Sequence, residues 1–273
     1  TQRLETLQRG VQRWGDGDLS ARVPVNGEDE VADLSARFNA AAERIEALMA
    51  TQTQLLASQK SLLANASHEL RSPLTRIRMG MELMGTQPGP TFREEISRNI
   101  AELDQLIDEI LLASRLDARE ADVGTVESID LLGLVVEESA RAGAELELAE
   151  GVDSLLVPGV AKLLRRLVRN LLENARRYGG AAGAPGITVM VGREGAQALL
   201  RVCDRGPGVP PEQRERIFEP FYRLPGASER EGGVGLGLAL VKSIAERHGG
   251  SVRCEAREGG GACFTVRLPR SVS

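Results

Sequence analysis

Apolar positions in the first third of the chain recur with a helical period. A first helix is predicted at 1–14, and a connector rich in helix breakers follows at 15–27. Acidic residues then open a second helix, where they suit the positive end of the helix dipole. The apolar seam of this second helix advances in alternating steps of three and four residues. Its members are Val31, Leu34, Phe38, Ala41, Ile45, Leu48, Leu55 and Leu62, with Gln52 and Gln59 at the remaining positions. These heptads predict a coiled coil, and the alternative is an amphipathic helix packed on its own domain.

The seam changes phase after Leu62. Two successive four-residue steps resemble a stutter, and the stripe continues as Ala66, Leu70, Leu74, Ile77, Met81 and Met84. A turn is predicted at 85–91, and a second amphipathic helix follows with Phe92, Ile96, Ile100, Leu103, Ile107 and Ile110 on one face. The two helices form an antiparallel hairpin, and two hairpins from two chains would form a four-helix bundle.

The pattern changes again beyond a linker predicted at 117–125. Short strand-like runs ("ITVMV", "ALLRVCD", "SVRCEA", "CFTVRL") alternate with the helical runs "AKLLRRLVRNLLENARRY" and "LGLALVKSIAERH". Glycine is also denser in this part of the chain. The sequence therefore predicts a separate α/β domain over about 126–270.

Composition narrows the classes of protein to which the chain can belong. The 273 residues are 42% hydrophobic and 27% charged, with a net charge of −5 and only 3% aromatic residues, so a nucleic-acid surface is not expected. Cys203, Cys254 and Cys263 have no CxxC spacing, and we interpret them as reduced core residues. No apolar run reaches a membrane span, and no signal peptide is visible. Because the chain begins with Thr1, we expect it to be a piece of a longer protein.

His68 is one of two histidines in the chain. It lies two residues from both Ala66 and Leu70, which is about 200° around a helix, so its imidazole should point away from the packed stripe. Glu69 beside it suits a base or orienting partner for a nucleophile. Pro73 removes a helix hydrogen bond to the carbonyl of Glu69 and permits a bend. The alternative is an ordinary exposed histidine.

Three further segments carry candidate chemistry. In "NLLENARRY", Asn170 and Asn174 share one helix face and could hold Mg²⁺ or phosphate oxygens. In "DRGPGVP", Asp204 ends a strand at a turn whose glycines permit close approach to a ligand. "GGVGLGLAL" places glycines before a helix whose first amides suit phosphate, although it matches neither a P-loop nor a Rossmann fingerprint. Between the last two lies a candidate lid with four arginines: Arg214, Arg216, Arg223 and Arg230.

In this order, the motifs resemble those of the bacterial two-component sensor histidine kinases. "SHELRSPL" resembles the phosphoacceptor box, "NLLENARRY" the asparagine box, "DRGPGVP" and "GGVGLGLALVKSIAERHGG" the two glycine boxes, and "FEPFYR" the phenylalanine box. Residues 1–53 resemble a HAMP signal-relay module. The resemblance implies a multidomain α and α+β fold. It comprises a HAMP-like coiled coil (1–53), a hairpin for dimerisation and histidine phosphotransfer (54–120) and a GHKL α/β sandwich that binds ATP (126–270).

The resemblance also implies roles for individual residues. His68 would be the phosphoacceptor and Glu69 would assist its deprotonation. Ser72 stands where many members carry Thr or Asn and would position the water that dephosphorylates the regulator. Asn174 would bind Mg²⁺. The remaining ATP-binding residues would be Asn170, Arg177, Tyr178, Asp204, Gly206, Gly208, Gly233, Gly235 and Gly237.

The implied activity is autophosphorylation of His68 from Mg-ATP, followed by transfer to an aspartate of a response regulator. The implied state is a homodimer, the cytoplasmic portion of a bacterial inner-membrane protein with upstream transmembrane and sensor segments. One alternative is a GHKL ATPase of the chaperone or topoisomerase type, against which His68 argues. Another is a degenerate kinase that acts as a scaffold. His248, the rival phosphoacceptor, ends a helix, and we interpret it as structural.

Overall fold

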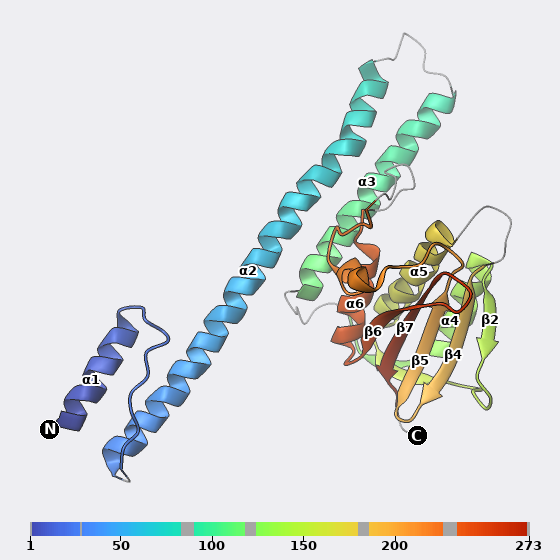
Figure 1. The fold of residues 1–273 in the computed structure, drawn as a ribbon. Coiled ribbons are helices and arrows are strands. Elements are labelled where there is room, and N and C mark those ends of the chain that lie inside the picture. The colour runs from blue at the N-terminus through green and yellow to red at the C-terminus, as the bar shows by residue number, and fades with distance from the viewer. Residues whose placement is uncertain are drawn as a thin grey trace. The chain divides into compact units, whose positions relative to one another are not determined.

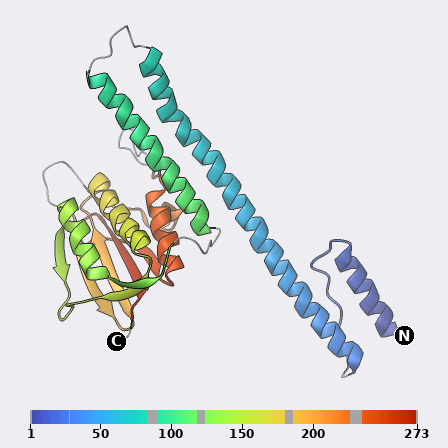
Figure 2. The same cartoon turned by 180° about the vertical axis from the view of Figure 1, so that it is seen from behind.

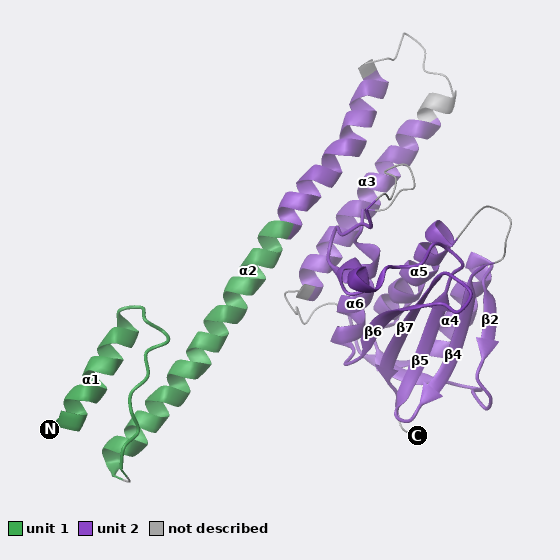
Figure 3. Ribbon diagram, in the orientation of Figure 1, with its two compact units in different colours: residues 1–61 green, residues 62–273 purple. Residues whose placement is uncertain are grey.

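A computed structural model describes residues 2–27, 29–82, 90–117, 124–179, 186–225 and 234–271. The chain divides into two compact units, 1–61 and 62–273 (Figure 3). Among the described residues, none of the helices has both the length and the apolar character that crossing a bilayer requires.

The first unit holds helix α1 (Gln2–Gly15), a connector and the first half of helix α2 (Glu30–Glu82). The connector is tied to α2 by the carboxamide of Asn39, which accepts from the backbone N–H of Val23 at 2.9 Å and donates to its carbonyl at 2.8 Å. The side chain of Val23 in turn fills the space in front of Gly10, where a Cβ would lie 2.1 Å from Val23 Cγ1. Gly10 is therefore the point at which the connector crosses α1.

Asp29 begins α2. Its Oδ1 accepts from the backbone N–H of Ala32 at 3.0 Å, and Arg3 forms a two-pronged ion pair with its carboxylate. The bond from Ala32 and the bonds from Arg3 hold the pKa of Asp29 below its ordinary value. This is the capping geometry that the acidic opening of the helix suggests.

Part of the predicted heptad seam is exposed within the chain. α2 is one continuous helix, as expected. In the first unit, however, the side chains buried along it are those of Ala32, Ser35 and Ala42. Leu34 and Leu48, on the predicted seam, are 52% and 62% exposed. Leu34 and Leu48 therefore lie on an exposed part of the seam, whereas Phe38 packs edge-on against Trp14 of α1.

The second unit begins with a helical hairpin formed by residues 62–82 of α2 and by helix α3 (Pro90–Asp117). Arg76 joins the two helices, donating to Asn99 Oδ1 at 3.0 Å and to Glu102 Oε2 at 2.8 Å. The helix continues through Pro73. Ile100 and Ile107, on the predicted apolar face of α3, are 46% and 42% exposed. The predicted turn at 85–91 lies mostly outside the described residues.

The rest of the second unit is the predicted α/β domain (Figure 1). A five-stranded sheet has the order β2-β4-β5-β7-β6, with β2 parallel to β4 and the other pairs antiparallel. Its strands are β2 (Glu145–Leu148), β4 (Thr188–Glu194), β5 (Gln197–Cys203), β6 (Ser251–Ala256) and β7 (Ala262–Pro269). A second sheet pairs β1 (Glu127–Asp130) with β3 (Leu156–Gly159).

Helices α4 (Leu131–Ala142), α5 (Ala161–Tyr178) and α6 (Gly237–Arg247) cover one face of the five-stranded sheet (Figures 1 and 2). Two short 3₁₀ turns, η1 (Pro211–Gln213) and η2 (Arg216–Phe218), precede α6. The core lies between helices and sheet, where Leu167, Leu200, Leu240 and Val266 are fully buried. Alternate residues of β4, β5 and β7 point into this core.

The interpretation of all three cysteines as reduced is wrong for two of them. Cys203 and Cys263 form a disulfide, with their Cα atoms 4.1 Å apart. The physical reason is register: the two residues lie directly opposite one another on the neighbouring strands β5 and β7. Their separation of 60 residues in sequence hides this pairing. Cys254 is a free, buried cysteine, as expected.

Candidate functional site

One face of α5 carries three of the predicted site residues. Asn170, Asn174 and Tyr178 follow at intervals of four and therefore lie along one stripe of the helix. Asn170 is 4% exposed, and its Nδ2 donates to the carbonyl oxygen of Gly237 at 3.1 Å. Asn174 is half-buried, and its carboxamide makes no hydrogen bond to the part of the chain that the structure describes. Asn170 thus anchors α6, whereas Asn174 has its amide oxygen free for a ligand.

Asp204 is the first residue after β5, and it is 3% exposed. Its Oδ1 accepts from the backbone N–H of Gly206 at 2.9 Å and from that of Ala262 at 3.2 Å, while its own N–H donates to the carbonyl oxygen of Ala262. These bonds fix the carboxylate on one side. Oδ2 makes no hydrogen bond to another described residue, so the buried carboxylate keeps an oxygen that can accept from a ligand.

The glycine turn after Asp204 lies against the end of α5. A Cβ on Gly206 would lie 1.9 Å from the carbonyl oxygen of Tyr178, so only glycine fits there. Gly208 has φ of 76° and lies close to Gly261, on the turn between β6 and β7. The turn therefore brings Asp204 beside Tyr178, which is half-buried at the last position of α5.

The start of α6 is set by a second glycine segment. Gly235 has φ of 79°, and its carbonyl accepts from the backbone N–H of Phe221 at 3.0 Å. Phe221 itself has φ of 62°, which is uncommon for a bulky residue. Gly237 is the first residue of α6, whose leading amides have no partner within the helix. Gly233 lies outside the described residues.

The predicted arginines differ in their surroundings. Arg177 is exposed, and no described contact brings it to Asp204 or to α6. Arg214 donates from Nε to the carbonyl of Val209 at 3.1 Å, and the guanidinium of Arg216 lies 4.5 Å from the centre of the Tyr222 ring. These two side chains therefore brace the segment before α6. Arg230 and much of the predicted lid lie outside the described residues.

His68 is exposed on α2, whereas Ala66 is buried, which confirms that the imidazole leaves the packed stripe. With Asn65 and Glu69 it lines a shallow hollow whose other wall is the segment 219–222. One turn later, the exposed Ser72 accepts from Nη1 of Arg76 at 3.0 Å. The phosphoacceptor candidate is thus presented to the segment that precedes α6.

His248 has a structural role. Its Nδ1 lies 2.7 Å from the carbonyl oxygen of Ile244, and its Nε2 accepts from the backbone N–H of Val160 at 3.1 Å. Since a carbonyl can only accept and an N–H can only donate, the ring is the neutral Nδ1–H tautomer. Burial, together with the nearby charge of Arg247, lowers the pKa of His248 despite the bond to Ile244. Both ring nitrogens form hydrogen bonds within the chain, which agrees with the interpretation of His248 as a structural residue.

Sequence reasoning missed Arg257, which braces the Asp204 turn. Its Nη1 donates to the carbonyl oxygens of Asp204 at 3.1 Å and of Gly186 at 3.2 Å, and its Nη2 donates to Thr188 Oγ1. The glycine run "REGGGAC" could have indicated a close approach at this turn. Arg76 was also missed, because its partners lie on a different helix.

Together these groups suit a purine nucleotide. A buried carboxylate can accept from an exocyclic amine, and the first amides of α6 can bind phosphate. No three His, Cys, Asp or Glu side chains cluster as a metal site within the described ranges. An amide oxygen such as that of Asn174, together with phosphate oxygens, is a ligand set that suits Mg²⁺.

Three family models match the chain. They are the histidine kinase-, DNA gyrase B- and HSP90-like ATPase over 159–272, the His Kinase A (phospho-acceptor) domain over 58–119 and the HAMP domain over 1–47. Sensor protein RstB of Escherichia coli is 35% identical over 268 residues, which cover 96% of this chain and 59% of RstB. The chain spans less than two thirds of the length of the curated relatives it matches.

Two solved structures share the fold. Full-length ShkA in complex with AMPPNP aligns with a TM-score of 0.53 at 26% identity, covering 78% of this chain and 46% of ShkA. Histidine kinase ThkA in complex with response regulator protein TrrA aligns with a TM-score of 0.61 at 23% identity, covering 84% of this chain and 66% of that one. With the helical hairpin and the α/β domain in the expected order, the chain belongs to the family of bacterial two-component sensor histidine kinases.

Proposed function

We propose that this chain phosphorylates itself on His68 from Mg-ATP and passes the phosphoryl group to an aspartate of a response-regulator receiver domain. The observation that carries the proposal is that the exposed imidazole of His68 lines a hollow together with the segment 219–222. Phe221 of that segment donates from its backbone N–H to the carbonyl oxygen of Gly235, just before α6. The proposed boundaries are 1–53 for the HAMP module, 54–120 for the hairpin and 126–270 for the ATP domain.

In this proposal the adenine base lies between Tyr178 and Asp204. Oδ2 of Asp204 accepts from the exocyclic amine, because Oδ1 is already engaged by Gly206 and Ala262. Gly206 and Gly208 let the backbone approach the base. The phosphates lie toward the first amides of α6, with Gly233, Gly235 and Gly237 on that side. Asn170 holds α6 in place, and Arg177 reaches the phosphates from the exposed side of α5.

Asn174 is the residue that would hold Mg²⁺, because its carboxamide is half-buried on the same face of α5 as Asn170. When bound, the cation neutralises charge on the phosphates. In the transfer step, a ring nitrogen of His68 forms a bond to the γ-phosphorus while the bond from that phosphorus to the bridging oxygen of ADP breaks. Glu69 accepts the ring proton. Positioning supplies most of the catalysis.

The proposed assembly is a homodimer. Leu34 and Leu48 of α2 and Ile100 and Ile107 of α3 are exposed within one chain, although their spacing is that of a packed seam. A second copy would cover both faces and complete a four-helix bundle. We further propose that the chain is the cytoplasmic portion of an inner-membrane protein with upstream sensor and transmembrane segments.

The test is incorporation of labelled γ-phosphate from Mg-ATP into the wild type, His68→Gln and His248→Gln. We expect acid-labile, base-stable label in the wild type and in His248→Gln, and none in His68→Gln. Label that persists in His68→Gln would contradict the site. ATP hydrolysis without any label would favour a GHKL ATPase, and nucleotide binding without hydrolysis or label would favour a scaffold.

Dephosphorylation of the regulator is the second activity that we propose. Ser72 is exposed one turn after His68, and Arg76 donates to its hydroxyl oxygen, which leaves the hydroxyl proton free to orient toward water. Ser72→Ala should slow loss of label from the phosphorylated regulator at least tenfold, the loss expected for one positioned catalytic group. Autophosphorylation should stay within twofold of the wild type. Equal loss of both activities would contradict this role.

A further inference from the structure

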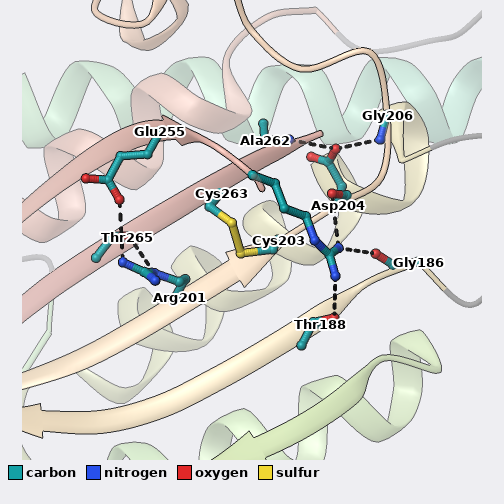
Figure 4. Close-up of a disulfide and its surroundings, with 11 residues drawn as sticks. Gly186, Thr188, Arg201, Cys203, Asp204, Gly206, Glu255, Ala262, Cys263 and Thr265 are labelled. Atoms are coloured by element: carbon teal, nitrogen blue, oxygen red, sulfur yellow. Dashed lines mark hydrogen bonds and ion pairs between the residues drawn. A yellow bond between two sulfur atoms is a disulfide. The ribbon is translucent and has the colours of Figure 1, made fainter. Parts of the chain in front are cut away.

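The disulfide lies directly beside the proposed adenine contact (Figure 4). Cys203 is the last residue of β5 and immediately precedes Asp204, while Cys263 immediately follows Ala262 on β7. Asp204 and Ala262 form a hydrogen-bonded pair through the N–H of Asp204 and the carbonyl of Ala262, at 2.9 Å. The disulfide thus lies next to the Asp204–Ala262 pair, and the N–H of Ala262 is one of the two backbone donors that hold the Asp204 carboxylate.

The strands place the two sulfurs together whether or not they are bonded. Hydrogen-bonded and non-hydrogen-bonded pairs alternate along an antiparallel ladder, so Cys203 and Cys263 form the non-hydrogen-bonded pair next to Asp204 and Ala262. In such pairs the Cα atoms lie about 4.5 Å apart and side chains are closest. The Cα separation here is 4.1 Å. A reduced pair would therefore remain poised to bond again.

The pair also lies on the face of the sheet that the helices do not cover. Ala198, Leu200 and Val202 of β5 point into the core, so Cys203, which alternates with them, points to the other face. Arg201 and Thr265 share this face and are joined by a 3.2 Å hydrogen bond (Figure 4). Cys203 and Cys263 are nevertheless only 9% and 7% exposed, so small thiols and disulfides would reach the sulfurs only through local opening of this face.

Cys254 is a natural internal comparison. It pairs with Phe264 on the core face of the sheet, it is 8% exposed, and it has no sulfur partner. Burial is the main cause that raises the pKa of its thiol to about 11, so little of it is the reactive thiolate at neutral pH. The chain thus has one cysteine pair beside the proposed nucleotide site, Cys203 and Cys263, and a third cysteine, Cys254, that lies on the core face without a partner.

We propose that Cys203 and Cys263 are a reversible redox modification site that sets the affinity of the chain for adenine nucleotides. The inference rests on the proposed ATP site around Asp204. The disulfide of this structure is the oxidised form of the site. Because a domain that uses cytoplasmic ATP works where thiols are kept reduced, reduction there would convert it to the dithiol. Oxidation fixes the ends of β5 and β7 before the nucleotide arrives, so less conformational entropy is lost on binding.

The chemistry is thiol–disulfide exchange with a low-molecular-weight disulfide. One protein thiolate attacks that disulfide, forms a mixed disulfide and releases one small thiolate. The second protein thiolate then attacks the protein sulfur of the mixed disulfide and releases the second small thiolate. The protein pair loses two electrons and two protons, and the small disulfide becomes two thiols. A small dithiol reverses the sequence and is itself oxidised to a cyclic disulfide.

The test measures ADP binding to the whole chain after oxidation by oxidised glutathione and after reduction by dithiothreitol, with the state verified by alkylation and mass spectrometry. We expect the Kd for ADP to rise at least threefold on reduction. Cys254→Ala should keep this change. Cys203→Ser combined with Cys263→Ser should abolish it and match the reduced wild type.

Equal affinity in the two states, or tighter binding by the reduced form, would overturn the redox inference while leaving the ATP site intact. The same ratio in the double serine variant would also overturn it, because the change would then not come from this pair. Failure of both states to bind ADP would overturn the proposed ATP site, and this inference with it. Each result therefore has one interpretation.

Discussion

The buried carboxamide of Asn170, on α5, donates a 3.1 Å hydrogen bond to the carbonyl oxygen of Gly237, the first residue of α6. The bond joins two helices whose sequences are far apart and fixes where the N-terminus of α6 lies. Four residues along the same face, Asn174 makes no such bond within the described residues. The two asparagines of one motif thus have different surroundings: Asn170 holds α6, and in the proposed site Asn174 faces the ligand.

Alanine at each of the two positions should separate these tasks. Asn170→Ala removes a hydrogen bond donated by a side chain that is only 4% exposed, so we expect unfolding free energy to fall by about 1 kcal/mol. Asn174→Ala removes only a ligand contact, so stability should stay within about 0.5 kcal/mol while Mg-dependent phosphorylation is lost. Denaturant unfolding and labelling of the two variants provide the measurement. Equal loss of stability would contradict the division.

The position of Gly235 makes a second prediction. Its φ of 79° is strained for alanine, and a Cβ would lie 2.9 Å from the backbone carbon of Phe221 and from the carbonyl oxygen of Tyr222. Gly235→Ala should destabilise the chain by more than the roughly 1–2 kcal/mol that the backbone angle alone costs. It should also weaken ADP binding, since the segment before α6 must move.

Gly195 is the matched control for Gly235. It has φ of 59° in the turn between β4 and β5, and a Cβ there would meet nothing within 4 Å. Gly195→Ala should therefore carry the angular strain without the clash and leave ADP binding unchanged. If the two variants unfold at the same denaturant concentration, the close contact of Gly235 with 221–222 contributes nothing measurable.

Much of this site could be predicted from sequence because its residues lie on regular elements. The four-residue spacing placed Asn170 and Asn174 on one helix face, and a strand-like run followed by a glycine turn placed Asp204 at the end of a strand. Both follow from local periodicity.

The pairing of Cys203 with Cys263 and the bracing of Asp204 by Arg257 depend on strand register between distant segments. A single sequence does not contain that register. Sequence periodicity also indicated apolar seams with side chains that are exposed in a single chain. A periodic apolar pattern reflects packing against any partner, including a second copy of the chain. Leu48 and Ile107 illustrate this point.

Glu138 carries a third prediction. It is 3% exposed on α4 and accepts from Arg165 at 2.7 Å and from Arg169 at 3.2 Å, both on α5. Burial alone would raise the pKa of Glu138, but the bonds from Arg169 and Arg165 outweigh it, and the pKa lies below the ordinary value. Glu138→Gln should lower unfolding free energy at pH 7 by about 1–3 kcal/mol, the range for hydrogen bonds to charged groups.

Glu137 is the control for Glu138, because it is 44% exposed and bonds the same Arg165. Glu137→Gln should change stability by less than about 1 kcal/mol, as an exposed ion pair does. Urea unfolding of both variants at pH 7 tests the difference. A larger effect at Glu137 would mean that burial does not govern the strength of this network.

His248 makes stability depend on pH. Its pKa is lowered chiefly by burial, so the unfolded chain binds the proton more readily than the folded chain does. The contribution of the neutral ring is therefore fully present above the ordinary pKa of about 6.5 and is lost as pH falls below it, with a slope of at most about 1.4 kcal/mol per pH unit. Protonation would also place an N–H on Nε2 facing the N–H of Val160, which now donates to it.

We expect wild-type unfolding free energy to fall between pH 7 and pH 5. His248→Gln should be less stable than the wild type at pH 7, but its unfolding free energy should depend less on pH between 7 and 5, because the glutamine side chain does not titrate. If the variant keeps the wild-type slope, the pH dependence comes from other groups. The lowered pKa of Glu138 belongs to a separate window, since stability from a carboxylate is lost only as pH falls through the acidic range below its ordinary value near 4.5.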